Sequence, residues 1–144
     1  MNKRLFSILF TLFLVGVLSV SCSNADKTGS GETKPTGIDS KYAGTWIGGG
    51  GLAGQTIVIN ADGSAKNQTV DFDMPASSIT KNSDTSYTAN YTFNPNTGVT
   101  VKGTMNIKFT SDTSANVTGK NIITYSDGSF TQDNINGTLT KQQQ

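Results

Sequence analysis

Two carboxylates separated by one residue are the side chains best spaced for chemistry in this sequence: Asp71 and Asp73 flank Phe72. On a β-strand they would share one face about 6.6 Å apart, a spacing that suits a calcium ion, a sugar or an acid–base pair. Most such pairs lie on solvated strand faces, however, and no Asp-x-Asp-x-Asp-Gly calcium loop is present. We therefore expect no catalytic residue and no metal site.

The chemistry that the chain lacks is equally informative. It has no His and a single Cys, Cys22, which excludes disulfides, a histidine base and the usual zinc and copper sites. Its one Arg is Arg4 and its lysines are spread singly, so neither nucleic acid nor another polyanion is an expected partner. The glycines at 48–51 lack the Lys-Ser/Thr of a phosphate-binding loop and predict a flexible loop. We expect a non-enzymatic protein without a cofactor.

The N-terminus has the pattern of an export signal. Lys3 and Arg4 precede an apolar run at residues 5–20. A helix over that run would rise only about 24 Å, short of the roughly 30 Å hydrocarbon core of a bilayer, so a removable signal is favoured. A permanent anchor helix is the alternative.

The segment LSVSC that ends at Cys22 resembles the lipobox of bacterial lipoproteins, in which small residues precede a Cys that is lipidated on sulfur and acylated on its amino group. The resemblance implies a lipoprotein signal peptide at residues 1–21 and attachment to a membrane through acyl chains on Cys22. Ser23, in place of the Asp that retains lipoproteins in the inner membrane, favours the outer membrane. The sequence leaves open whether the domain faces the periplasm or the cell surface.

The segment after Cys22 is polar. Between Ser23 and Ser40, Ile38 is the only aliphatic side chain larger than Ala, so the segment buries too little surface to fold. We expect a lipidated N-terminus and flexible tether over residues 22–40 and a folded domain over residues 41–144. A degenerate N-terminal strand is the alternative.

From Lys41 onward, apolar residues recur at every second position, which is the period of a half-buried strand. Residues 99–109 alternate most clearly, with Val, Met, Ile and Phe on one face and Thr, Lys and Asn on the other. Turn-forming Gly, Asn, Asp and Pro separate the runs. The predicted strands are 42–48, 55–60, 64–73, 77–82, 86–93, 98–110, 115–125 and 129–140. This pattern predicts an all-β fold, a small antiparallel up-and-down β-barrel of about eight strands, with a β-sandwich as the alternative.

Gly44-Thr45-Trp46 resembles the Gly-x-Trp signature that opens the first strand of lipocalins and lipocalin-like bacterial barrels. The resemblance implies that Trp46 plugs the closed end of the barrel and that Gly44 and Trp46 form the floor of a ligand cavity. The family's Arg that packs over the Trp has no counterpart, and Lys120 or Lys141 is the candidate substitute. The alternative is an ordinary core tryptophan with no cavity above it.

These observations predict a lipid-anchored binding module of the cell envelope, with a small apolar molecule or a protein as its partner. A surface-exposed antigen or adhesin without a pocket is one alternative. An inhibitor that presents a loop, such as residues 48–51 or 74–86, to a lytic enzyme or protease is another. Outward Asn and Thr on the strands suit a glycan as well as they suit solvent.

Overall fold

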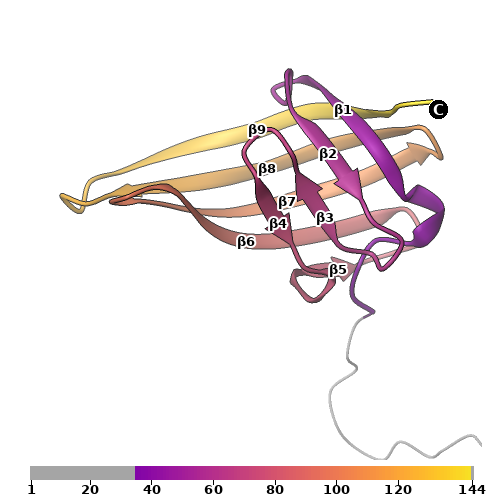
Figure 1. The fold of residues 1–144 in the computed structure, drawn as a ribbon, viewed down its shortest axis with the longest axis horizontal. Coiled ribbons are helices and arrows are strands. Elements are labelled where there is room, and N and C mark those ends of the chain that lie inside the picture. Colours follow the sequence, from indigo (N-terminus) through magenta and orange to yellow (C-terminus); the bar gives the residue numbers. More distant parts are fainter. Residues whose placement is uncertain (1–34, 144) are drawn as a thin grey trace, which may run out of the picture. The chain divides into compact units, whose positions relative to one another are not determined.

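Alternating side chains and short turns produce one antiparallel β-sheet that curls into a nearly closed barrel in the computed structural model, which describes residues 35–143 (Figure 1). Apart from two short 3-10 turns, η1 Ser40–Tyr42 and η2 Ala76–Ser78, no helix occurs in this range, and none there is long and apolar enough to cross a membrane. The all-β prediction is confirmed. The strands are β1 Gly44–Gly50, β2 Thr56–Ile59, β3 Ala65–Asn67, β4 Phe72–Met74, β5 Ile79–Lys81, β6 Ser86–Asn96, β7 Val99–Ser111, β8 Ser114–Tyr125 and β9 Phe130–Lys141.

Three of the predicted features lie outside the described residues. These are the signal peptide at residues 1–21, the lipidation site Cys22 and the tether as far as residue 34. The core and the sheet hydrogen bonds of the domain are made among residues 35–143, within the compact unit Thr33–Gln144.

The strands follow one another around the sheet as a meander. Their order is β4-β3-β2-β1-β9-β8-β7-β6-β5, so sequence neighbours are also neighbours in space, except that β1 pairs with β9 and that β4 and β5 are the two ends. In the β1–β9 pair, Trp46 lies opposite Lys141 and Gly50 lies opposite Gly137. This up-and-down antiparallel order agrees with the predicted barrel and not with a sandwich.

The strands differ greatly in length, and this difference shapes the barrel. Strands β2–β5 have only 3 or 4 residues, whereas β6–β9 have 11 to 13. Figure 1 shows the four long strands continuing as a ribbon beyond the short ones. We call the barrel end from which this ribbon extends the mouth, and the opposite end, at the β7–β8 turn, the closed end.

A short N-terminal segment occupies the gap beside the sheet end formed by β5. Thr36 forms an isolated antiparallel bridge with Thr80. The N–H of Gly37 donates to the carbonyl oxygen of Ile79 at 2.8 Å. Backbone groups on the edge of β5 are thus satisfied by the chain that leads into the barrel.

The same segment also reaches the β2–β3 turn. The N–H of Ile38 donates to the carbonyl oxygen of Gly63 at 2.9 Å, and the Ile38 side chain is only 3% exposed. Gly37 and Gly63 both have positive φ, and a Cβ on either would come within 3.2 Å of the Cα of the other, so a side chain at either position would obstruct this approach. Residues 35–40, predicted as tether, therefore belong to the folded domain, which begins before Lys41.

One predicted strand, 64–73, is two strands in the structure. Residues 68–71 form a turn between β3 and β4, so the sheet has nine strands where about eight were expected. The Asn67 side-chain oxygen accepts the backbone N–H groups of Thr69 and Val70, a local bond that competes with strand pairing. Asp71 has a positive φ of 48°, which ends the turn.

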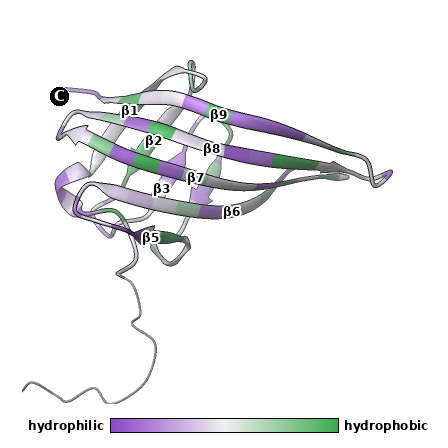
Figure 2. Ribbon diagram, turned by 180° about the vertical axis from the view of Figure 1, so that it is seen from behind, coloured by the Kyte–Doolittle hydropathy of each residue, from purple (hydrophilic) through white to green (hydrophobic). Residues whose placement is uncertain are grey.

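The alternation predicted for residues 99–109 is present. Val101, Met105, Ile107 and Phe109 are buried while the residues between them face outward or lie at intermediate depth. Figure 2 shows this alternation as hydrophilic (purple) and hydrophobic (green) bands along β7 and β8. One face of the long strands is therefore the inner wall of the barrel and the other is its outer surface.

Candidate binding cavity

Aromatic side chains fill the closed end of the barrel. Trp46 is fully buried, and its Nε1 donates to the carbonyl oxygen of Tyr42 at 2.9 Å. The Phe109 ring stacks on the Tyr42 ring with centroids 3.6 Å apart and meets the indole edge-on at 5.3 Å. The closed end is therefore filled by aromatic rings in direct contact with one another.

The second residue of the predicted cavity floor, Gly44, has a different role. Its φ of 140° is a backbone conformation that glycine adopts readily and other residues rarely adopt. The Lys141 side chain passes directly over Gly44, where a Cβ would collide with it. The Lys141 ammonium lies 5.9 Å from the centroid of the Trp46 ring, within cation–π range. Of the two lysines predicted to pack over the Trp, Lys141 is therefore the one that does so, while Lys120 lies on the outer face of β8.

Gly44 borders a surface depression at the closed end rather than a cavity floor. The depression has a volume of about 790 Å³ and is lined by small residues and the C-terminal Lys141, Gln142 and Gln143. Few apolar side chains face it, so it offers little apolar contact to a ligand despite its size.

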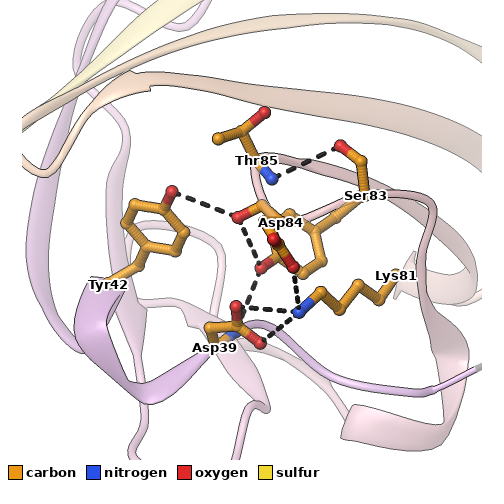
Figure 3. Close-up of polar contacts among 7 residues, drawn as sticks. Asp39, Tyr42, Lys81, Ser83, Asp84 and Thr85 are labelled. Carbon is orange, nitrogen blue, oxygen red and sulfur yellow. Dashed lines mark hydrogen bonds and ion pairs between the residues drawn. The ribbon is translucent and has the colours of Figure 1, made fainter.

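A polar network fastens the N-terminal segment to the β5–β6 turn (Figure 3). The Lys81 ammonium contacts a carboxylate oxygen of Asp39 at 3.0 Å and one of Asp84 at 2.9 Å. The Asp84 carbonyl oxygen accepts hydrogen bonds from the hydroxyls of Tyr42 at 3.3 Å and Tyr87 at 3.4 Å. The hydrogen bond and charge of Lys81 lower the pKa of Asp84, and the two carboxylates raise the pKa of Lys81. One ammonium shared by two carboxylates leaves these three groups with a net charge of −1, and their contacts tie the N-terminal segment to the β5–β6 turn.

A partly open cavity lies at the mouth. A cavity of about 250 Å³ opens between the short strands and the inner wall of the ribbon. Most of its wall is apolar, and no charged side chain lines it. Its lining residues are Gly51, Leu52, Gln55, Ile57, Asn67, Val70, Phe72, Met74, Tyr91, Phe93, Met105, Asn121 and Ile135.

Trp46 and Gly44, the predicted floor, are not among these lining residues. Ile57, which lies opposite Trp46 on the neighbouring strand, lines the cavity instead. Ile57 thus lies between the cavity and the strand that carries Trp46, and the indole itself packs among the aromatic side chains of the closed end.

Tyr91 forms one wall because its cross-strand partner has no side chain. Tyr91 lies opposite Gly103, and a methyl group on Gly103 would collide with the tyrosine ring. The Tyr91 hydroxyl donates to Oδ1 of Asn121 at 2.6 Å, which fixes the ring across the sheet. Burial raises the pKa of Tyr91, so its hydroxyl is a neutral hydrogen-bonding group at physiological pH.

Aromatic residues from the two sides of the barrel meet at the mouth. Phe72, on β4, lies 4.7 Å from Phe93 and 5.6 Å from Tyr91 between ring centroids, in tilted arrangements. Val70 stands at the rim with 46% of its surface exposed. The mouth therefore combines aromatic walls with an apolar side chain that is still in contact with water.

The glycine run contributes to the cavity by admitting Leu52. A side chain on Gly48 would collide with the Leu52 backbone, so the chain can fold back over β1 only at glycine. The N–H of Gly48 donates to the carbonyl oxygen of Gln55, and that of Gly51 donates to Asn136, each at 2.9 Å. Residues 48–51, predicted as a flexible loop, instead end β1 and begin a hydrogen-bonded turn.

Three amides supply the polar groups of the cavity wall. Asn67 Nδ2 donates to Oε1 of Gln55 at 2.8 Å, and Asn121 Oδ1 accepts from Tyr91. With both acceptor oxygens engaged, Nε2 of Gln55 and Nδ2 of Asn121 are the groups left to donate. A ligand atom that accepts hydrogen bonds would be matched at these positions.

Asp71 and Asp73, the pair first considered for chemistry, do not form a site. Asp71 belongs to the turn before β4, so the two carboxylates do not share one strand as expected. Both contact the Lys66 ammonium, at 2.7 Å and 3.5 Å respectively, and both are largely exposed. Within residues 35–143, no group of acidic, Cys or His side chains could hold a metal ion.

Comparisons with protein-family models, with curated proteins and with solved structures find no match for this chain. Function must therefore be inferred from the cavity and from the surfaces of the molecule itself.

Proposed function

We propose that this chain is a non-enzymatic binding module of a bacterial cell envelope, held on the outer membrane by acyl chains on Cys22. Its ligand is a small molecule whose uncharged, apolar part enters the cavity at the barrel mouth. The observation that carries the proposal is the cavity of about 250 Å³ with an apolar, uncharged lining. The membrane anchor follows from the lipobox-like segment that ends at Cys22.

The lining selects against charge. Transferring an ionised group into a cavity without a countercharge costs several kcal/mol, whereas each buried methylene contributes about 0.8 kcal/mol. Asn121 and Gln55 add donors for one or two acceptor atoms. An apolar ligand with a carbonyl or ether oxygen matches these properties.

The size of the cavity indicates how such a ligand is held. Typical small-molecule pockets measure about 300–1,000 Å³, so 250 Å³ encloses only part of a larger ligand. The inner face of the ribbon continues outward from Phe93 through Val101, Ile123 and Tyr125. Tyr125 is 40% exposed, so this strip offers further apolar contact to the part that protrudes.

The ligand proposal is tested with N-phenyl-1-naphthylamine, a neutral probe that fluoresces in apolar surroundings, added to residues 23–144. We expect saturable binding that Val70→Asp weakens about five- to tenfold, because a carboxylate at the rim removes an apolar contact of roughly 1 kcal/mol. Ile47→Asp is the matched control, since Ile47 is similarly exposed, 42% against 46%, but does not line the cavity. Equal effects of the two substitutions, or no saturable binding, would contradict the proposal.

The anchor proposal is tested on the full-length chain. Wild-type protein expressed in a bacterium should incorporate radiolabelled palmitate and partition into the detergent phase of Triton X-114. Cys22→Ser should abolish the palmitate label, because its hydroxyl does not replace the thiolate that accepts the lipid, and the variant should keep the size of the unprocessed precursor. Unchanged labelling of the variant would overturn the anchor while leaving the cavity proposal intact.

A further inference from the structure

The outer face of strands β6–β9 is a polar surface that carries lysines but no acidic residue. Its outward residues are identified by alternation with the buried positions of each strand. They are Ser86, Thr88, Asn90 and Thr92 on β6; Thr100, Lys102, Thr104, Asn106, Lys108 and Thr110 on β7; Asn116, Thr118, Lys120, Ile122 and Thr124 on β8; and Phe130, Gln132, Asn134, Asn136, Thr138 and Thr140 on β9. We call this surface the outer face; Figure 2 views the molecule from the side on which these four strands lie in front.

The acidic residues of the domain all lie elsewhere. Asp112 and Asp127 are in turns, and Asp133 alternates onto the inner side of β9. The remaining described acidic residues belong to the N-terminal segment, the short strands and their turns: Asp39, Asp62, Asp71, Asp73 and Asp84. The outer face is therefore a region of uncompensated positive charge on a nearly neutral protein.

The lysines of the outer face differ from Lys66 and Lys81 in their partners. Lys66 and Lys81 each contact two carboxylates within 4 Å. Lys102, Lys108 and Lys120 form no ion pair with any residue in the part of the chain that the structure describes. Lys41 and Lys141, outside the outer face, likewise form no ion pair among the described residues. The charges of the outer-face lysines are free to meet an anionic partner, and the sheet register gathers them although the sequence spreads them singly.

Two of these lysines stand beside an exposed apolar pair. Lys102 lies directly opposite Ile122, and Lys120 lies directly opposite Thr104, so the lysines are diagonal neighbours, about 7–8 Å apart at the backbone. Ile122 and Phe130 are diagonal neighbours across β8 and β9, with exposures of 38% and 70%. Most of the Phe130 ring is therefore open to a partner.

We propose that the outer face binds an acidic polysaccharide, an extended glycan that carries carboxylate, sulfate or phosphate groups. Lys102 and Lys120 meet the anionic groups, Phe130 and Ile122 pack against the apolar C–H face of a sugar ring, and side chains such as Gln132 and Asn134 meet its hydroxyls. This surface lies on the opposite side of the sheet from the cavity. The inference therefore stands independently of the proposed small-molecule ligand.

Charge and composition favour a glycan over nucleic acid. Duplex-binding proteins typically neutralise 6–10 phosphates, and the outer face has three lysines and no arginine. Its many amides and hydroxyls match a partner that is rich in hydroxyl groups. Strand β7, with 13 residues, is about 43 Å long, enough to follow an extended chain over several sugars.

The test measures binding of residues 23–144 to polygalacturonate, heparin, neutral dextran and a duplex DNA of matched length, at 50 mM and 200 mM NaCl. We expect one or both acidic glycans to bind in a salt-dependent manner and dextran not to bind. The double variant Lys102→Gln, Lys120→Gln should weaken that binding at least tenfold, and Phe130→Ser should weaken it about threefold.

The matched control is Lys41→Gln, Lys141→Gln, which removes the same charge from residues outside the outer face. A less than twofold effect of this control supports a localised site. Equal losses in the two double variants would reduce the interaction to net charge and overturn the proposal. Tighter binding to DNA than to either acidic glycan, or no binding to any polymer, would also overturn it.

Discussion

The two ends of the barrel are built from the same strands and the same kinds of residue, yet they are packed differently. At the closed end, Tyr42, Trp46 and Phe109 are all 3% exposed or less and contact one another. At the mouth, Tyr91 and Phe93 continue the same inner face of β6 but are only partly buried and border a cavity. The closed end therefore supplies packing that stabilises the domain, whereas the mouth leaves the space that we propose for the ligand.

Strand length explains the difference. Near the closed end every side of the barrel is covered, because the N-terminal segment and β5 cover the side that the short strands leave open. Toward the mouth, β2, β3 and β4 stop after 3 or 4 residues while β6–β9 continue. Tyr91 and Phe93 still meet Phe72 of β4 across the barrel. Beyond them the long strands extend past the short ones (Figure 1), so inward side chains have fewer partners and space remains at the mouth.

The comparison predicts very different costs for one substitution made at the two ends. Phe109→Ala removes a ring in contact with Tyr42, Trp46 and Tyr87, so it should lower the free energy of unfolding by about 3–5 kcal/mol. Phe93→Ala removes a half-buried ring at the mouth and should cost about 1–2 kcal/mol. Urea denaturation followed by the fluorescence of Trp46, the one indole of the chain, measures both values.

The informative result is which of the two variants loses more free energy of unfolding, and we expect the larger loss for Phe109→Ala. Equal losses for the two variants would mean that the mouth is as tightly packed as the closed end. If Phe109→Ala does not fold, the milder Phe109→Leu and Phe93→Leu pair should show the same order of losses.

A smaller effect is the pH dependence that Tyr87, at the closed end, adds to the stability of the domain. Burial, the largest cause, raises the pKa of Tyr87 to about 12, against about 10 for a free tyrosine. Because the folded form holds its proton more tightly, the contribution to stability is complete below pH 10 and is lost as the pH rises from 10 through 12. The loss should be on the order of 1–2 kcal/mol and smaller in Tyr87→Phe. Urea denaturation at pH 9, 10.5 and 11.5, followed by circular dichroism, tests it, and parallel curves for the two proteins would contradict this assignment.

Much of the fold could be predicted from the sequence because the period of two is a local property. The runs at residues 86–93, 98–110 and 115–125 each lie within a few residues of an observed strand. The turn within residues 64–73 was missed because Asn67 satisfies the backbone there with its side chain. The N-terminal segment was missed because its order depends on backbone contacts with distant residues, which a polar sequence does not reveal.

The cavity was harder to locate than the strands. Trp46 was correctly expected to be buried. The alternation of apolar and polar residues does not reveal how far each strand extends past its neighbours, and that difference in length opens the mouth. The roles of Gly48 and Gly103 depend on Leu52 and Tyr91, which come close to them only in the sheet register. Glycine at an inward position of a clearly alternating strand, as at Gly103, was the available signal for a close-packed ring.

The central claim, that the mouth cavity holds an uncharged apolar ligand, is tested most directly by the methyl signals of methionine. Met74 and Met105 are the only methionines in residues 23–144, and both line the cavity. In a carbon–proton spectrum of protein labelled at the methionine methyl groups, titration with N-phenyl-1-naphthylamine should shift both signals saturably, with one dissociation constant shared with the fluorescence. Methyl signals that stay in place while the probe fluorescence saturates would show that the probe binds elsewhere and would contradict the account.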